Sequence, residues 1–118
     1  MAVTQSRDTR TVIAGADLSA AQFKFITHAG VVAGDGAAAF GVCVVEAASG
    51  NAATVNVSGK TMVKAGGTVT ANGAVASDAA GLCVDAGTGD IVLGYATEAG
   101  VTDQIIAIEL INGGNAAA

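Results

Sequence analysis

Apolar residues in this chain come in short runs that are separated by Gly, Asn, Asp and Ser. The runs recur at roughly ten-residue intervals, which is typical of β-barrels and β-sandwiches. They predict strands at 22–27, 31–33, 40–45, 54–57, 61–65, 68–70, 74–76, 82–84, 91–95 and 104–111. In the first of these the side chains alternate, so Phe23 and Phe25 are expected on one face and Lys24 on the other. Single helical turns are expected only at 17–22 and 98–102.

The pattern occurs twice along the chain. Residues 15–30 (GADLSAAQFKFITHAG) align with residues 66–81 (GGTVTANGAVASDAAG) at an offset of 66 − 15 = 51, and with small gaps Gly41 then aligns with Gly94. A repeat of this length indicates two supersecondary units, neither of which closes a core alone. We therefore expect one all-β domain, a small β-barrel or sandwich over 14–111, built from pseudo-repeats of about 15–58 and 66–110. Residues 112–118 are expected to form a flexible tail.

Residues 1–13 are polar and β-prone, and we place them outside the repeat. They predict an extended N-terminal arm, with a disordered terminus as the alternative. An arm of this kind can add as a strand to a neighbouring chain through main-chain hydrogen bonds. Deleting residues 2–12 is then expected to leave a folded body that has lost its partner. The candidate contact residues are Ala2, Val3, Thr4, Gln5, Ser6, Arg7, Asp8, Thr9, Arg10, Thr11 and Val12.

Composition narrows the class of protein. With 118 residues the chain forms one small domain. It carries five Lys and Arg against ten Asp and Glu, a net charge of −5, which disfavours nucleic-acid binding because that needs a basic face. The longest nearly apolar run, 36–45, is about half of what a membrane-spanning helix needs. The N-terminus lacks the apolar stretch of a signal peptide, so the protein is expected to be made and kept in the cytosol, or packaged there.

Candidate chemistry is sparse. Catalysis by a nucleophile needs a base and an orienting group, and the one histidine, His28, sits alone at a predicted strand end, where a solvated or packed role is expected. Cys43 and Cys83 stand alone in apolar strands and are expected to be buried, and whether they pair stays open. Acidic residues in the matched loops 34–36 and 85–90 make a calcium site conceivable, although their spacing matches no EF-hand. We expect no enzymatic activity, no cofactor and no metal.

Four segments resemble the small capsid cement (decoration) proteins of tailed bacteriophages. They are 14–30 (AGADLSAAQFKFITHAG), 40–67 (FGVCVVEAASGNAATVNVSGKTMVKAGG), 69–84 (VTANGAVASDAAGLCV) and 91–100 (IVLGYATEAG), and the resemblance covers about residues 10–111. It implies a β-barrel or sandwich, usually a homotrimer, on the outer surface of the capsid. It also implies an N-terminal segment that lies over major capsid protein subunits, no enzymatic activity, and assembly in the cytoplasm of the host bacterium.

Two alternatives remain open at this stage. Biotinyl and lipoyl carrier domains are also small two-halved β-barrels, and the segment 60–64 (KTMVK) places Met62 between two lysines, although their motif sets the modified Lys in a tight hairpin turn. A surface-displayed binding β-module is the second alternative. An exposed aromatic platform would favour it, whereas Tyr95 is expected in a buried strand.

Overall fold

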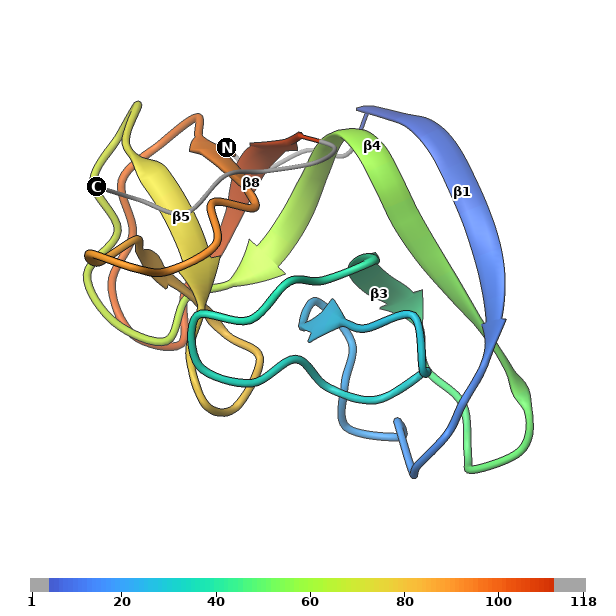
Figure 1. Ribbon diagram of the computed structural model, residues 1–118. Coiled ribbons are helices and arrows are strands. Elements are labelled where there is room, and N and C mark those ends of the chain that lie inside the picture. Colours follow the sequence, from blue (N-terminus) through green and yellow to red (C-terminus); the bar gives the residue numbers. More distant parts are fainter. Residues whose placement is uncertain (1–4, 112–118) are drawn as a thin grey trace.

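The computed structural model describes the backbone of residues 5–111 and the side chains from Thr9 onward, and it confirms the predicted all-β class (Figure 1). No helix occurs within 5–111, and so none there is long and apolar enough to cross a membrane. The strands are β1 (Gln5–Ile13), β2 (Phe25–Ile26), β3 (Gly41–Val45), β4 (Ala52–Lys64), β5 (Ala74–Ser77), β6 (Cys83–Asp85), β7 (Gly94–Ala96) and β8 (Ile105–Leu110).

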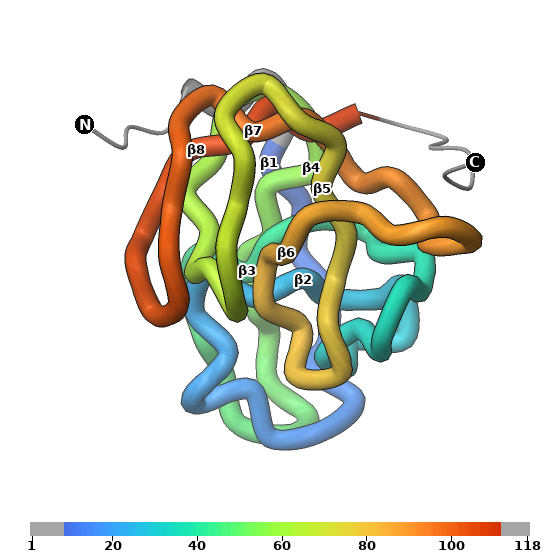
Figure 2. The backbone as a smooth tube through the Cα atoms, turned by 90° about the vertical axis from the view of Figure 1, so that its left-hand side faces the viewer, coloured from blue at the N-terminus to red at the C-terminus, as the bar shows by residue number. Residues whose placement is uncertain are grey.

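The strands form one sheet in the order β2-β3-β4-β8-β7-β5-β6, with β1 paired to β4 off this path. All neighbouring strands are antiparallel. The sheet curls around itself into a nearly closed barrel, which is clearest in the view turned by 90° from Figure 1 (Figure 2). Backbone bonds such as Phe25 N–H to Gly81 O, 2.8 Å, join segments that are far apart in the sequence.

Strand register shows how the two halves correspond. In the β1–β4 pair Ile13 lies opposite Ala52, and in the β4–β8 pair Lys64 lies opposite Ile105. The offsets are 64 − 13 = 51 and 105 − 52 = 53. Equivalent turns are separated by the same number of residues. The Gly30 N–H donates to Thr27 O at 3.0 Å, and 51 residues later the Gly81 N–H donates to Asp78 O at 3.1 Å.

The 13-residue strand β4 consequently belongs to both halves. Its first part pairs with β1 as the last strand of the first half, and its second part pairs with β8 as the first strand of the second half. Sequence patterning predicted two strands here, at 54–57 and 61–65, because Ser58-Gly59-Lys60 reads as a turn. Gly59 has a φ of +88° and lies opposite a register shift near Ser6 in β1. The backbone therefore makes a local bulge at Gly59, and β4 continues through it without a turn.

The same register corrects the position of the N-terminal segment. Residues 5–13 are the first strand of the first half, equivalent to 56–64 of β4, and pair along their length with β4 of their own chain. They therefore do not stand outside the repeat. Residues 1–4 and the expected tail at 112–118 lie outside the described residues.

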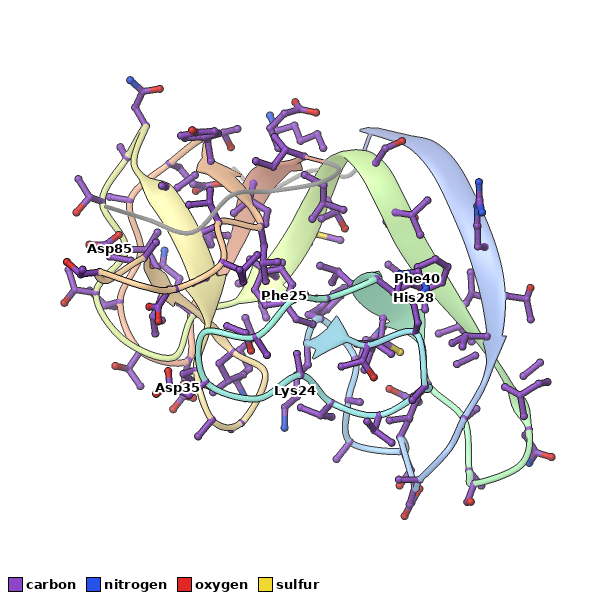
Figure 3. All side chains as sticks on the ribbon, in the orientation of Figure 1. Lys24, Phe25, His28, Asp35, Phe40 and Asp85 are labelled. Atoms are coloured by element: carbon purple, nitrogen blue, oxygen red, sulfur yellow. The ribbon has the colours of Figure 1, made fainter. Side chains whose placement is uncertain are left out.

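The described residues form two buried clusters, a smaller one within the first half and a larger one that both halves share. Ala14, Leu18, Cys43 and Ala53 are buried together in the first half, and their repeat equivalents Ala65, Val69, Ala96 and Ile106 are buried in the second. The second cluster also contains Phe25, Ala33 and Val42 from the first half. The larger core therefore depends on both halves, and Figure 3 shows Phe25 in the interior between them.

Several local expectations are wrong: residues 98–102 form no helical turn, and the predicted strands 31–33 and 68–70 are single bridges at Val32 and Val69. Phe23 has a φ of +67°, which breaks the alternation predicted for 22–27, and only Phe25–Ile26 form a strand. Residues 17–22 make tight turns in place of a helical turn, with Asp17 Oδ1 accepting the Ser19 N–H at 3.0 Å. A hydrogen bond from the Ser19 side chain and, second, this N–H bond lower the pKa of the Asp17 carboxyl because they stabilise the charged form.

Candidate interaction site

The predicted contact residues divide into three groups. Ala2, Val3 and Thr4 lie outside the described residues. Gln5, Ser6, Arg7 and Asp8 form the start of β1 and are described by their backbone alone. The side chains of Thr9, Arg10, Thr11 and Val12 are described, and they alternate between the two faces of β1.

The outward face of β1 carries exposed threonine and isoleucine side chains. Thr11 is exposed, and Ile13 is 60% exposed although it is apolar. Thr9 donates from Oγ1 to Asn56 Oδ1 at 3.0 Å, and the Asn56 amide donates in turn to Thr61 Oγ1 at 3.0 Å. Asn56 and Thr61 are buried, so this chain of hydrogen bonds fixes β1 on β4.

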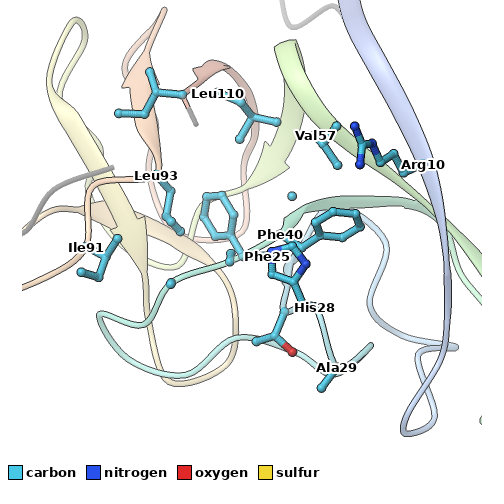
Figure 4. A pocket seen from close by; sticks show the side chains of 14 residues that line it. Arg10, Phe25, His28, Ala29, Phe40, Val57, Ile91, Leu93 and Leu110 are labelled. Carbon is cyan, nitrogen blue, oxygen red and sulfur yellow. The ribbon is translucent and has the colours of Figure 1, made fainter. Parts of the chain in front are cut away.

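The inward face of β1 contributes Arg10 to a cleft of about 670 Å³ (Figure 4). Most of the residues that line the cleft are apolar or aromatic, while polar and apolar atoms contribute nearly equally to its surface. Its residues are Arg10, Phe25, Thr27, His28, Ala29, Ala38, Ala39, Phe40, Gly41, Val57, Ile91, Leu93, Leu110 and Ile111. This volume lies within the range of about 300–1,000 Å³ that is usual for ligand sites.

Three polar groups belong to this wall. Arg10 brings a permanent positive charge, and no carboxylate occurs among the described lining residues. Thr27 Oγ1 is buried without a hydrogen-bond partner. The His28 ring packs against Phe40 with centroids 4.4 Å apart and a tilt of 42°.

Two of the acidic side chains in these loops accept hydrogen bonds from other groups of this chain. Asp85 accepts both the N–H and the hydroxyl of Thr70, each at 2.8 Å, and Asp90 accepts the Gly87 N–H at 2.9 Å. Asp35 is exposed in a separate loop from Asp85 (Figure 3). Across the described part of the chain, no three His, Cys, Asp or Glu side chains come together as metal ligands would.

Both cysteines are free and fully buried. Burial raises the pKa of Cys83 to about 12, with smaller contributions from Asp85 and Asp78. Burial also raises the pKa of Cys43, and Glu46 adds to the effect. Because the thiolate is the reactive form, both thiols are expected to be inert at neutral pH.

The structure also locates the residues on which the two alternative functions, a carrier domain and a surface-displayed binding module, were based. Lys60 and Lys64 are within β4 and are paired with β8, whereas a carrier domain needs its lysine at a hairpin tip. Lys64 Nζ lies 3.8 Å from Asp103 Oδ1. Tyr95 was expected in a buried strand but is 47% exposed, because β7 has one buried and one open face.

The sequence matches no family model and no curated protein. Among solved structures, the fold is similar to that of the N base of the head fibre gp8.5 of bacteriophage phi29. The TM-score is 0.71 at 16% sequence identity, and the match covers 93% of this chain and 98% of that chain. At this identity the similarity establishes a shared fold over nearly the whole of both chains.

The cleft was not predicted from the sequence. A usable signal was nevertheless present, since Phe40 and Leu93 lie at an offset of 93 − 40 = 53 and Val57 and Leu110 at 110 − 57 = 53, the spacing that relates the later parts of the two halves. Large apolar residues at equivalent positions before and inside equivalent strands indicate a place where the halves face each other.

Proposed function

We propose that this chain is a structural protein of a tailed-phage head. Within that class we propose a decoration protein that binds the outer capsid surface and bridges major capsid subunits. The observation that carries the proposal is the fold shared with a head fibre base over nearly the whole of both chains. The sequence segments that resemble decoration proteins support it independently.

We propose that the protein works by adhesion and without catalysis. The carboxylate of Asp85 accepts hydrogen bonds from Thr70 in another loop, that of Asp90 holds the turn of its own loop, and the buried thiols have raised pKa values. A bridging protein needs many contacts of modest strength, because copies that bind a repeating lattice act together through multivalency.

The proposed capsid contact runs along β1, which contains most of the residues predicted from the sequence, Ala2–Val12. Thr11 and Ile13 on the outward face of β1 supply an exposed strand surface that is partly apolar. An apolar side chain that is 60% exposed gains free energy when a partner covers it. The partner in this proposal is the major capsid protein, and the protein itself is a homotrimer on the outside of the virion.

Adding the purified protein to heads that lack it tests this proposal. We expect saturable binding in many copies per head, counted by quantitative gel analysis, and localised density on the outer surface by cryo-electron microscopy. Heads that take up no protein would contradict the proposal. Deleting residues 2–12 is a poor test of the contact, because the deletion removes most of β1 and the hydrogen bonds it makes with β4.

A matched pair of substitutions tests the contact. Ile13 and Val101 are 60% and 61% exposed, so a charge at either position should change folding stability little. We expect Ile13→Glu to weaken head binding and Val101→Glu to leave it unchanged. Equal binding by both variants would place the contact away from β1.

A second candidate, anchoring a fibre to the head, is favoured by the structural neighbour, which is a head fibre base. Native particles separate the two functions. A fibre anchor predicts density that continues outward from this domain, and a decoration protein predicts a domain that ends at its own surface.

A further inference from the structure

Strand β1 has one edge that no other element covers within the described residues. Its register on β4 places Ile13 opposite Ala52, and the next residue, Ala14, donates its N–H to Asn51 O at 2.9 Å. Successive N–H groups of a strand point to opposite edges, so the Ile13 N–H and both main-chain polar groups of Thr11 point away from β4. No described strand or loop bonds to these groups, and β1 is the outermost strand in Figure 1.

The open part of this edge ends at Ile13. The Ile13 carbonyl lies beside Gly30, where an added Cβ would meet it, and the Gly15 N–H donates to Gly30 O at 2.9 Å. The turn at 27–30 therefore covers the edge beyond Ile13. What stays open at these positions is the N–H and the C=O of Thr11 and the N–H of Ile13. A row of unpaired main-chain groups on a strand edge is a template for pairing with another chain.

The duplicated fold shows what covers the equivalent edge in the second half. At the offset of 51, Ile13 corresponds to Lys64 of β4. The Lys64 N–H points away from β8 and donates to Phe23 O at 3.0 Å. Lys60 pairs with β8 on one edge and with Gln5 of β1 on the other. Main chain of the first half therefore covers this edge of the second half, and no described segment does the same for the first half.

The side chains beside the open edge differ from their repeat equivalents. Ile13 is 60% exposed and corresponds to the charged Lys64. Val45, which lies in the same row as Thr11 two strands away, is 57% exposed and corresponds to Glu98 at the offset of 98 − 45 = 53. The second half thus has charged residues at surface positions where the first half has apolar ones. Because apolar side chains gain free energy when they are covered, the difference indicates that a partner covers the first half.

We infer that the outer edge of β1 binds an extended segment of the major capsid protein as an additional strand. The inference rests on the proposed head-binding function and names the mode of recognition. Thr11 exchanges two hydrogen bonds with one residue of the segment, and the Ile13 N–H donates to a carbonyl two residues away. These bonds select an extended main chain, and side chains select the sequence. The outward side chains of the segment pack on Thr11 and Ile13, which favours apolar or β-branched residues there.

The repeat comparison argues against a second copy of this chain as the occupant. The equivalent of Phe23, which covers the edge of the second half, is Ala74 at the offset of 51. The Ala74 carbonyl already accepts the Ala86 N–H at 3.0 Å, and Ala74 is paired with Tyr95. The second half of another copy therefore has no open carbonyl at the position that would cover β1, and a different protein supplies the strand.

Hydrogen exchange of single amides tests the edge without using heads. It is followed by NMR on the full isotope-labelled protein. We expect the amides of Thr11 and Ile13 to exchange at least about a hundredfold faster than that of Val12, which points toward β4. Equal protection of the three amides would overturn the inference, because the edge would already be covered. Protection that rises with protein concentration would identify a second copy as the occupant and would overturn it as well.

Proline substitutions connect the edge to the heads. Thr11→Pro removes the open N–H and no bond to β4, so we expect it to fold and to lower the affinity for heads at least about tenfold. Thr11→Val keeps the N–H and the branched shape and should bind heads nearly as well as the unmodified protein. Val12→Pro is the matched control for folding, since it removes an N–H on the β4 side and should lower the thermal unfolding midpoint more than Thr11→Pro does. Full head binding by a folded Thr11→Pro overturns the inference.

Exchange measured on decorated heads decides the matter even if Thr11→Pro does not fold. In the unmodified protein, we expect peptides that contain Thr11 and Ile13 to gain protection on binding, measured by mass spectrometry. Unchanged exchange of these peptides on heads that carry the protein overturns the inference and leaves the proposed function intact. If the unmodified protein does not bind heads, the proposed function fails, and the capsid partner named here fails with it.

Discussion

Phe25→Ala is the most informative single substitution for the shared core. The Phe25 side chain is fully buried in the larger core cluster, and its backbone N–H bonds to Gly81 O in the other half. Core Phe→Ala changes cost about 3–5 kcal/mol, from lost burial and from the cavity that remains. Since the neighbouring cleft lets water approach that cavity, we expect the lower end, about 3 kcal/mol.

This loss is measurable by urea unfolding. A domain of this size has a free energy of unfolding of about 5–15 kcal/mol, so the variant should still fold. With an m-value of about 1.5 kcal/mol per M, the midpoint should fall by about 2 M. Phe25→Leu keeps most of the volume and should lose less than about 1.5 kcal/mol.

Phe23→Ala is the matched control. Phe23 is only half-buried and lies outside both core clusters, so we expect a loss of about 1 kcal/mol. The reasoning is refuted if Phe25→Ala destabilises the protein no more than Phe23→Ala, because the halves would then not depend on a common core.

Three further predictions concern stability. Gly30 has a φ of +78° and an added Cβ would meet a backbone carbonyl, so Gly30→Ala should cost more than about 1 kcal/mol in urea unfolding. Asn56→Ala removes the donor to the buried Thr61 hydroxyl and should cost about 1–3 kcal/mol in the same assay. Cys83 has its pKa raised from 9.0 to about 12 on folding, so the folded protein keeps a proton that the unfolded chain loses. The free energy of unfolding should therefore fall between pH 9 and 12, and less steeply in Cys83→Ala.

Each of these predictions has a comparison that can contradict it. Gly89 has a φ of +87° with open space around it, so Gly89→Ala must cost less than the Gly30 change. Thr54→Ala changes a half-buried threonine of the same strand as Asn56 and should cost less than about 0.5 kcal/mol. Parallel pH profiles of the unmodified protein and Cys83→Ala would show that the thiol proton makes no contribution.

Alternation and repetition predicted much of this fold. Val75 and Ala76 in β5 and Ile106–Ile108 in β8 are buried strand residues at the predicted places, because their apolar side chains fit only the core. Phe23 could not be predicted, since its positive φ depends on tertiary bonds, including the Lys64 N–H to Phe23 O bond of 3.0 Å.

The N-terminal strand was missed although the sequence carries its signal. Val12, Ala14 and Gly15 align with Val63, Ala65 and Gly66 at the offset of 51, so the repeat extends upstream of Gly15. Polar residues hid this match, because Thr9 and Thr11 face outward while Val12 packs inward. The cleft was missed for another reason: its walls come from two halves, and only the folded barrel brings them together.

Strand β4 has a mechanical consequence. One continuous, extended strand runs from the first half into the second. A force that pulls the halves apart along this strand therefore acts first on its covalent backbone and only afterwards on the side-chain contacts between the halves. Hinge bending needs a few residues that are free to change their φ and ψ angles, and at the junction the ladders on either side of Gly59 restrict such changes. The molecule should therefore respond to tension as a single stiff element.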